Sequence, residues 1–440
     1  MLKKRYTLFI LFACLALSPA TIMAITLNEC IETALEMNPD LDAAAYRVKA
    51  SRAAHLQARS PWYPALSASG SYMRTNNPSQ AFMMELNQKK LDMTDPGFDP
   101  ADPDDIDNTR IRLGMRYLLY DGGRSRLNEQ MAEQGIDISR YEHAAVKNEL
   151  IYEVTRGYYE ALKAGEFIAV FRKTADSIEK SLQLAKQRFQ EGTAVKTDVL
   201  NLEVQLLQAQ EDLIVAENGF SLAIAALNTS IGADIVYPDK LLPPERKITA
   251  PAVAAAEQNT VAKRPEMQAA ALIVKSKKLD LTHAKRAYLP SVEAMGALDL
   301  DSPVSDNFED SYVAGVTAKW DIFSGYARSA KVSESRALRN ESLAFLKKTR
   351  KQLELDLKQA ELQLSNAFQR LDVTRKAIEN AEESLRITRE RYENGAVEIT
   401  ALLNAQSAMT ASSVRNKAAY YDYLEALANI KRATGEKWPW

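Results

Sequence analysis

The sequence has little proline and glycine, with only 16 of each among 440 residues. Proline is absent from residues 104–237 and again from residues 304–438. Between Tyr326 and Asn394 there is neither proline nor glycine, so about 69 consecutive residues contain no helix breaker. This segment predicts one helix of roughly 100 Å, at a rise of about 1.5 Å per residue.

Cysteine and histidine are also scarce, with two and three residues. Cleavage of a leader at Ala24 would leave Cys30 as the one remaining cysteine, which excludes an intrachain disulfide. Cys14 follows Leu-Phe-Ala, a poor match to a lipoprotein cleavage site, so an incidental thiol is favoured over lipidation. The histidines stand far apart, with no cysteine or carboxylate at ligand spacing, so we expect no metal and no cofactor. They are His55, His143 and His283.

Charge of one sign is not in excess either. The formal net charge of −2 gives no reason to expect nucleic acid as a partner. The carboxylate pairs Glu382-Glu383 and Asp104-Asp105 fall on an expected helix surface and an expected loop, which favours solvation over catalysis. The glycine-rich DGGRSR, from Asp121, lacks the downstream Lys-Ser/Thr of a phosphate-binding loop. We therefore expect no enzyme.

The N-terminus has the composition of an export signal at residues 1–24. Lys3, Lys4 and Arg5 precede an apolar stretch that ends at Leu17, and Ala24 offers a small residue for cleavage. No later stretch approaches 18 consecutive apolar residues, so no membrane-spanning helix is expected. The alternative is that this segment is a buried N-terminal helix.

The chain contains an internal repeat. RFQEGTAVKTDVL, from Arg188, is followed 203 residues later by RYENGAVEITALL, from Arg391. The same offset pairs Gly192 with Gly395, whereas before residue 75 the offset becomes 226, which leaves 23 extra residues in the first copy. We predict a first repeat at 25–232, a linker at 233–261 and a second repeat at 262–440.

Each repeat contains a coiled-coil pattern. Twelve positions alternate spacings of four and three residues for more than five heptads, which predicts a packed seam. In the second copy they are Leu353, Leu357, Ala360, Leu364, Ala367, Leu371, Thr374, Ile378, Ala381, Leu385, Thr388 and Tyr392. In the first copy they are Leu150, Val154, Gly157, Ala161, Ala164, Ile168, Phe171, Ala175, Ile178, Leu182, Ala185 and Phe189.

Shorter helices should cover these long seams. Return helices are expected at Asp198–Ile231 and Ala401–Thr434, after turns at the repeated glycines. Each is about half as long as its partner, so we expect the helices at Pro39–Arg59 and Pro265–Ala287 to stack end to end with them.

Four short segments alternate apolar and polar residues with a period of two, which predicts strands near 64–74, 110–120, 290–300 and 311–323. Their length suits a tilted membrane strand. Aromatic residues gather at the strand ends nearest the helices, as in an interfacial girdle. These are Trp62, Tyr63, Tyr120, Tyr288, Trp320 and Phe323. The alternative is a small soluble sheet packed on helices.

Four strands cannot close a barrel, and open strand edges are not tolerated in lipid. The protomer is therefore expected to oligomerise around an axis, with polar strand faces towards a lumen and apolar faces towards lipid. The long helices would continue this barrel as a coiled-coil cylinder, which predicts a conduit. The rival interpretation is an exported coiled-coil scaffold without a channel.

Several motifs together resemble one family. ITLNECIETALEMNPDL near the expected mature start, LLYDGGRSR and IFSGYARSA after strands, and RFQEG with RYENGA at the turns are similar to the TolC family of outer-membrane efflux ducts. The resemblance implies a homotrimer with a twelve-stranded outer-membrane β-barrel and a twelve-helix periplasmic tunnel. It also implies a passive conduit in tripartite efflux or type I secretion. Its partners would be a periplasmic adaptor and an inner-membrane pump or secretion ATPase.

The resemblance places a periplasmic gate at the repeated turns. Thr197 and Asp198 occupy the acidic position of the first hairpin, and Tyr392 the tyrosine position of the second. The chain departs from the family pattern, with Val397 in place of an arginine and Ala401 and Asn404 in place of aspartates. Candidate charged partners are Lys196, Arg391 and Glu398, beside the turn glycines Gly192 and Gly395. The alternative is that Thr197 or Asp198 only caps its helix.

The extra residues of the first copy include an acidic stretch, DPGFDPADPDDIDN, from Asp95. It connects the first two strands on the side away from the helices, so it should face outside as a solvated loop. A lid over the pore and a weak calcium site are the alternatives, although the spacing fits no standard calcium loop.

Overall fold

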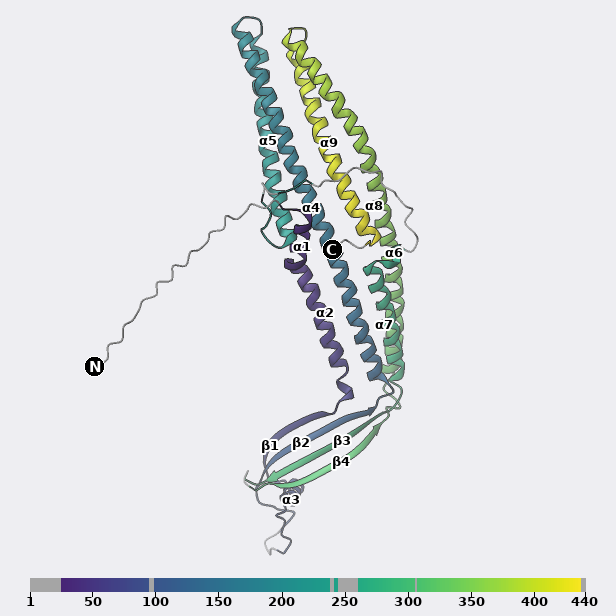
Figure 1. Ribbon diagram of the computed structural model, residues 1–440. Coiled ribbons are helices and arrows are strands. Elements are labelled where there is room, and N and C mark those ends of the chain that lie inside the picture. Colours follow the sequence, from purple (N-terminus) through teal and green to yellow (C-terminus); the bar gives the residue numbers. More distant parts are fainter. Residues whose placement is uncertain (1–24, 95–98, 238–240, 244–259, 305–306, 437–440) are drawn as a thin grey trace, which may run out of the picture.

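In a computed structural model of the protein, the structure describes residues 25–94, 99–237, 241–243, 260–304 and 307–436. The predicted signal segment 1–24, with Cys14, lies outside the described residues, as do most of the predicted linker 233–261 and residues 95–98 of the acidic stretch. The described parts form an elongated body with two helical tips at one end and a sheet at the other (Figure 1).

Apart from α3, which only the first repeat contains within the described residues, the two repeats have corresponding helices and strands. The first comprises α1 (Leu27–Met37), α2 (Pro39–Ala58), β1 (Ala65–Thr75), α3 (Pro78–Asn87), β2 (Ile106–Tyr120), α4 (Arg124–Gln190) and α5 (Lys196–Ile231). The second comprises α6 (Thr260–Lys263), α7 (Pro265–Arg286), β3 (Ser291–Ser302), β4 (Glu309–Lys319), α8 (Ala327–Glu393) and α9 (Ile399–Thr434). A single 3-10 turn, Ser60–Trp62, connects α2 to β1.

The duplication fixes the lengths of the long elements. The helices α4 and α8 both have 67 residues, and α5 and α9 both have 36. Their bounds are separated by the same offset of 203 residues, since 327 − 124, 393 − 190, 399 − 196 and 434 − 231 all give this number. The long helices therefore extend for about 100 Å each, and the prediction of a single unbroken helix is confirmed in both copies.

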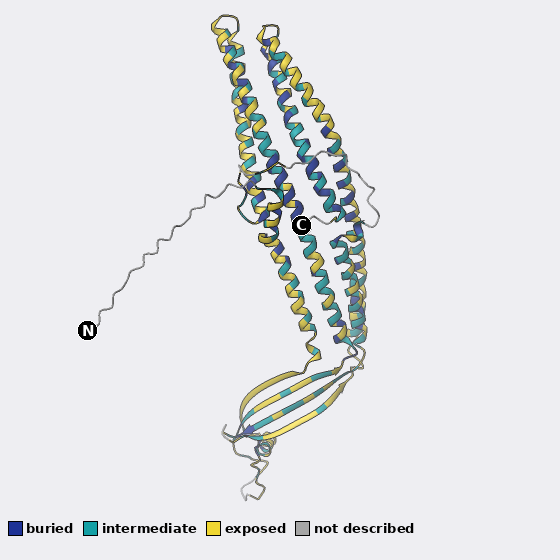
Figure 2. Ribbon diagram, viewed as in Figure 1, coloured by how far each residue is buried: buried dark blue, intermediate teal, exposed yellow. Residues whose placement is uncertain are grey.

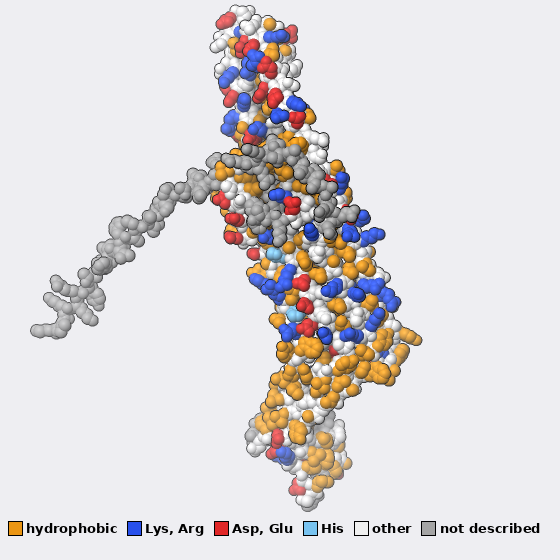
Figure 3. Space-filling model, turned by 45° about the vertical axis from the view of Figure 1, so that its right-hand side comes forward, with side chains coloured by type: hydrophobic (Ala, Val, Ile, Leu, Met, Phe, Trp, Pro, Cys, Tyr) orange, Lys and Arg blue, Asp and Glu red, His pale blue; other side chains and the backbone are white. Residues whose placement is uncertain are grey.

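The sheet has the order β1-β2-β3-β4, with every neighbouring pair antiparallel. One face is polar and holds two ion pairs between β2 and β3, Arg110 with Asp301 at 2.8 Å and Arg112 with Asp299 at 2.6 Å. The other face is apolar and exposed, and hydrophobic side chains form a band over the sheet (Figure 3). Its exposed members include Leu66, Leu113, Met115, Leu298, Tyr312 and Val316.

The fourth strand is shorter than predicted. The alternating pattern predicted a strand to residue 323, but β4 ends at Lys319. Lys319 pairs with Ser291, the first residue of β3. The preceding residue on that side is Pro290, which has no N–H to extend the ladder. Trp320 and Phe323 therefore lie beyond the strand.

The helices form a layer with defined edges. Near the tips, α4 packs against α5 and α9, and α9 packs against α8, which gives the lateral order α5, α4, α9, α8 (Figure 1). Nearer the sheet, α2 and α7 pack against α4, and α7 also packs against α8. Phe189, a predicted seam residue, is 45% exposed, but most of the predicted seam is buried along both long helices (Figure 2). Its buried members are Leu150, Val154, Ala161, Ala175, Ile178, Leu182, Ala185, Leu353, Leu357, Ala360, Leu364, Ala367, Leu371 and Tyr392.

The predicted stacking of short helices is confirmed at the junction of α1, α2 and α5. Asn38 begins α2 and donates from Nδ2 to the carbonyl of Ser230 at 2.8 Å, near the end of α5. Gly232 ends α5 with φ +84°. A Cβ at this position would lie 2.9 Å from the carbonyl oxygen of Met37. The end of α5 is thus seated closely on the start of α2.

The corresponding junction of the second repeat is charged. Arg264, with a side chain only 5% exposed, precedes α7 and pairs with Asp356 at 2.6 Å and Glu266 at 2.7 Å. Arg432 of α9 also pairs with Asp356, at 2.7 Å. Burial raises the pKa of Asp356, but hydrogen bonds from the two arginines outweigh it and leave that pKa below its usual value.

A short helix, α3, lies at the end of the sheet away from the long helices and was not predicted. It buries Ala81 and Met84. Gln88 follows it and donates to the carbonyl of Asp107 at 2.8 Å and to Oδ1 of Asn108 at 2.9 Å. Asn108 is buried and, by the alternation of β2, shares the polar face with Arg110. The helix therefore covers the outer end of the polar sheet face, and it precedes the acidic stretch that starts at Asp95.

Candidate functional site

The two helical hairpins end in matching turns. Gly192 and Gly395 adopt left-handed backbones, with φ of +75° and +70°. Gly192 N–H donates to the carbonyl of Phe189 at 3.1 Å, and Gly395 N–H donates to that of Tyr392 at 3.0 Å. No atom lies within 4 Å of a Cβ built on either glycine. Glycine is therefore required here by the left-handed backbone and not by close packing, and both turns are exposed.

The residues that follow the turns do not cap their helices through side chains. Val195 is the N-cap of α5 and Glu398 the N-cap of α9, and neither helix has a side-chain cap hydrogen bond. The alternative that Thr197 or Asp198 acts as the cap is therefore wrong. Within the described chain, no ion pair joins Asp198 to Lys196 or Arg391, or joins Glu398 to Lys196.

Tyr392 occupies the contact between the two hairpins. Its side chain is 5% exposed and belongs to a cluster with Ile399 and Leu402 of its own hairpin and Leu182 and Ala185 of the other. Burial raises the pKa of Tyr392, the negative charge of Asp198 adds to this, and Arg188 opposes it. Of the predicted tip residues, Tyr392 is thus buried between the hairpins, and the negative charge of Asp198 acts on its hydroxyl.

Arg188 is the tip residue that the sequence reasoning did not identify. Its Nη1 donates to the carbonyl of Tyr392 at 2.8 Å, and its Nη2 donates to the carbonyl of Glu393. The guanidinium also lies 5.4 Å from the centroid of the Tyr392 ring. These carbonyls belong to the last turn of α8, where a cation is favoured by the helix dipole. The sequence feature that could have identified Arg188 is its position as an arginine in the last turn of α4.

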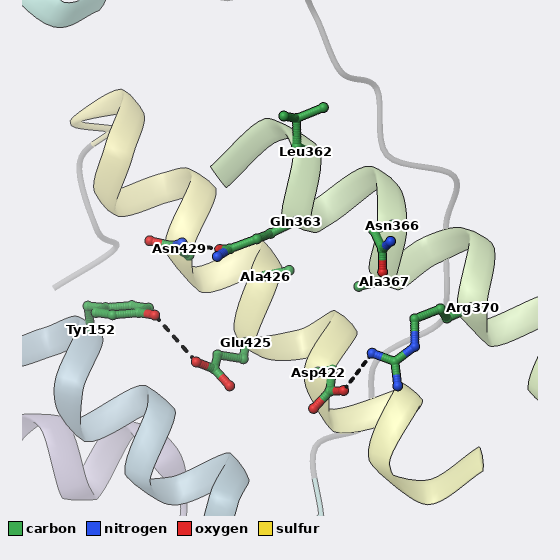
Figure 4. A pocket seen from close by; sticks show the side chains of 10 residues that line it. All are labelled: Tyr152, Leu362, Gln363, Asn366, Ala367, Arg370, Asp422, Glu425, Ala426 and Asn429. Atoms are coloured by element: carbon green, nitrogen blue, oxygen red, sulfur yellow. Dashed lines mark hydrogen bonds and ion pairs between the residues drawn. The ribbon is translucent and has the colours of Figure 1, made fainter. Parts of the chain in front are cut away.

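Polar contacts continue along the interface of the two hairpins. Ser177 donates to Oε1 of Gln406 at 2.9 Å, and Lys417 pairs with Glu166 at 2.8 Å. Further from the tips, a groove of about 420 Å³ lies between α4, α8 and α9. Figure 4 shows that its polar side chains face one another across these helices. The pairs are Arg370 with Asp422, Gln363 with Asn429, and Tyr152 with Glu425.

These groove residues have the features of interhelical packing. Burial and the nearby Glu160 raise the pKa of Glu425. In the part of the chain that the structure describes, no group of three or more His, Cys, Asp or Glu side chains is arranged to hold a metal ion.

Cys30 is fully buried, and burial raises the pKa of its thiol to about 12, which makes it unreactive.

The six predicted girdle residues all lie where the strands meet the helices, and all are exposed. Trp62 and Tyr63 precede β1, Tyr120 ends β2, Tyr288 precedes β3, and Trp320 and Phe323 follow β4. Two of them hydrogen-bond to groups where the helices meet the strands. Trp62 Nε1 donates to Glu129 at 3.0 Å, and Trp320 Nε1 donates to the carbonyl of Tyr288 at 3.0 Å. Tyr326, which packs edge-on against Phe323, extends this set.

Among the described residues, one helix has the length and composition of a membrane span, contrary to expectation. It is α5, with a mean hydropathy of 1.2 over 18 residues, of which 17% are buried. Its exposed apolar residues lie on one side of the helix, away from α4. They are Leu200, Val204, Leu207, Ile214, Val215 and Leu222.

An exposed apolar sheet, an aromatic band and two parallel helical hairpins of equal length define a membrane-anchored helical duct. The chain belongs to the outer membrane efflux protein family, whose model matches residues 30–233 and 257–436. The resemblance inferred from the sequence motifs is therefore confirmed. Membership of this family assigns the protein to the outer membrane as a channel component.

Individual proteins agree with this assignment. The chain is 22% identical to the pyoverdine export outer membrane protein OpmQ of Pseudomonas aeruginosa, over 94% of this chain and 85% of that protein. It is 21% identical to the outer membrane protein TolC of Vibrio cholerae, over 99% and 96% of the two chains. The fold matches the crystal structure of the CmeC outer membrane channel of Campylobacter jejuni, with a TM-score of 0.82, 16% identity, and coverage of 93% and 85%.

Proposed function

We propose that the protein is the exit duct of a tripartite efflux or type I secretion system, assembled as a homotrimer. The sheet is the observation that carries this proposal. It has an exposed apolar face and two edges, β1 and β4, with no further strand beside them in the described chain. Open edges are not tolerated in lipid, so the sheet must close with other copies. Three protomers with four strands each supply twelve strands.

The helices support the same assembly. The lateral order of the layer leaves α5 on one edge and α8 on the other. We expect the exposed apolar side of α5 to pack against α8 of the next protomer. This contact accounts for the hydropathy of α5 without a membrane, because α5 lies at the end of the molecule opposite the sheet (Figure 1). The six aromatic residues would then mark the inner boundary of the bilayer.

The proposed partners follow from this geometry. With the sheet in the outer membrane, the two hairpin tips extend about 100 Å into the periplasm and are available to a periplasmic adaptor. An inner-membrane pump or secretion ATPase would supply the energy, since the duct is proposed to be passive and without catalysis or cofactor. OpmQ is named for pyoverdine export, and AprF, another relative, for alkaline protease secretion. Both types of cargo are compatible with a passive duct.

The trimer is tested by light scattering and conductance. The detergent-solubilised protein is expected to give a protein mass near three copies of a chain of 49.0 kDa, less its leader. It should also partition with outer membranes and form ion-conducting channels in planar bilayers. A water-soluble protein that forms no channels would support the scaffold interpretation. A monomer that still conducts ions would overturn closure by three copies.

We propose further that the tips constrict the resting duct, with Asp198 and Tyr392 among the contacts that an adaptor releases. Tyr392 supports this role because it is buried between the two hairpins, against Leu182 and Ala185, with the negative charge of Asp198 nearby. The double variant Asp198→Ala with Tyr392→Phe should raise single-channel conductance, because it removes the charge and the hydroxyl but retains the ring. Unchanged conductance in a correctly assembled trimer would exclude the two residues from the gate.

A further inference from the structure

We propose that Arg391 clamps adjacent protomers together at the tips by binding the carbonyl oxygens of Phe189 and Gln190 of the neighbouring copy. This inference rests on the trimer proposed above. In the trimer it adds three clamps between protomers to the three Arg188 clamps, of which each chain makes one within itself.

The internal duplication identifies the atoms involved. A shift of 203 residues converts Arg188 into Arg391, and the carbonyls of Tyr392 and Glu393 into those of Phe189 and Gln190. The same shift converts α4 into α8 and α5 into α9. In a closed ring with the order α5, α4, α9, α8, the interface of α4 with α9 is therefore repeated by α8 with α5 of the next copy. The clamp by Arg188 crosses the first interface, so its counterpart must cross the second.

In the single chain, Arg188 makes its contact with the carbonyls of α8, whereas the corresponding contact of Arg391 is not made. Tyr392, which Arg188 covers, is 5% exposed, whereas its counterpart Phe189 is 45% exposed although it continues the same seam. Arg391 is exposed, and its guanidinium has no hydrogen-bond or ion-pair partner within the described residues. A second copy would supply the carbonyls to Arg391 and cover the Phe189 ring.

The chemistry of the two contacts is equivalent. Both arginines lie near the end of a helix of 67 residues, and both carbonyl pairs belong to the last turn of such a helix. The C-terminal carbonyls carry a partial negative charge and lack the regular amide donor four residues further on. Those of Phe189 and Tyr392 accept one bond from a turn glycine and keep a second lone pair, so a guanidinium with several N–H groups is a suitable ligand. Lysine keeps the charge but cannot donate in the same forked geometry.

Proximity can be tested in the assembled protein with a short bis-maleimide reagent. The double variant Arg391→Cys with Gln190→Cys should yield dimers and trimers on denaturing gels, because the two thiols belong to adjacent copies. The control Glu379→Cys with Gln190→Cys places the first thiol three helical turns away and should remain monomeric. The native Cys30 is fully buried and does not compete.

The clamp itself is tested by single substitutions. Arg391→Ala should raise channel conductance and shift the trimer to a lower dissociation temperature, and Arg391→Lys should restore only part of the loss. A correctly sized trimer that is not cross-linked at Arg391 and Gln190 would overturn the clamp and leave the duct proposal intact. The absence of any trimer in the wild-type protein would overturn the duct proposal itself.

Discussion

Replacement of Leu364 by aspartate is expected to abolish the assembled protein in the membrane. Leu364 is 4% exposed and lies in the core cluster that joins α8 to α9 and α4, together with Tyr421 and Tyr423. The new carboxylate would be buried with no partner, and such changes cost more than about 4 kcal/mol. Trypsin resistance and the yield of heat-stable trimer in outer membranes measure the effect.

The matched control is Leu364→Met, which retains an apolar side chain of similar volume and should cost less than about 1.5 kcal/mol. Equal trimer yields for the aspartate and methionine variants would contradict the seam register. Glu361, on the same helix, is not a suitable exposed comparison. Its side chain is only 19% exposed and pairs with Lys358 at 3.4 Å.

The variant Gly232→Ala is expected to destabilise the helix junction strongly. An alanine at φ +84° is strained by about 1–2 kcal/mol. Its Cβ would also lie 2.9 Å from the carbonyl oxygen of Met37 and 3.1 Å from Cα of Asn38, so the start of α2 would have to move. We expect a total loss of about 3 kcal/mol or more, seen as a lower temperature of trimer dissociation.

Gly192→Ala provides the comparison, because φ is +75° there and no atom lies within 4 Å of the new Cβ. It should show only the backbone strain, and hence a much smaller shift in dissociation temperature. If both variants shift the temperature equally, the close contact of α5 with α2 contributes nothing and the backbone alone accounts for the effect.

The long helices and the strands were predictable because their signals are local and repeated. In α8, a 3.5-residue period without proline or glycine fixes both the helix and its buried face, from Leu353 to Leu371. The alternation in β2 places Arg110 and Arg112 on one face and Leu113 on the other. The repeat offset then transfers each assignment from one copy to the other.

Other features depend on partners that are distant in sequence. The helix α3 is short, and Gln88 and Asn108 anchor it from positions 20 residues apart. The end of β4 depends on Pro290, which lies in a different strand connection. The role of Arg188 depends on carbonyls of Tyr392 and Glu393, which no side-chain pattern encodes. Sequence periodicity describes faces of elements, and it does not specify which ends meet.

The equal lengths of the two hairpins restrict how such a protein can change. A single residue inserted into α8 alone would raise that tip by about 1.5 Å and rotate it by about 100° relative to the other. The six hairpin ends of a trimer would then no longer be coplanar, and alternate ends would present different side chains to any ring that docks on them. Lengthening this molecule therefore requires the same insertion in both repeats, and whole heptads are the increments that preserve its faces.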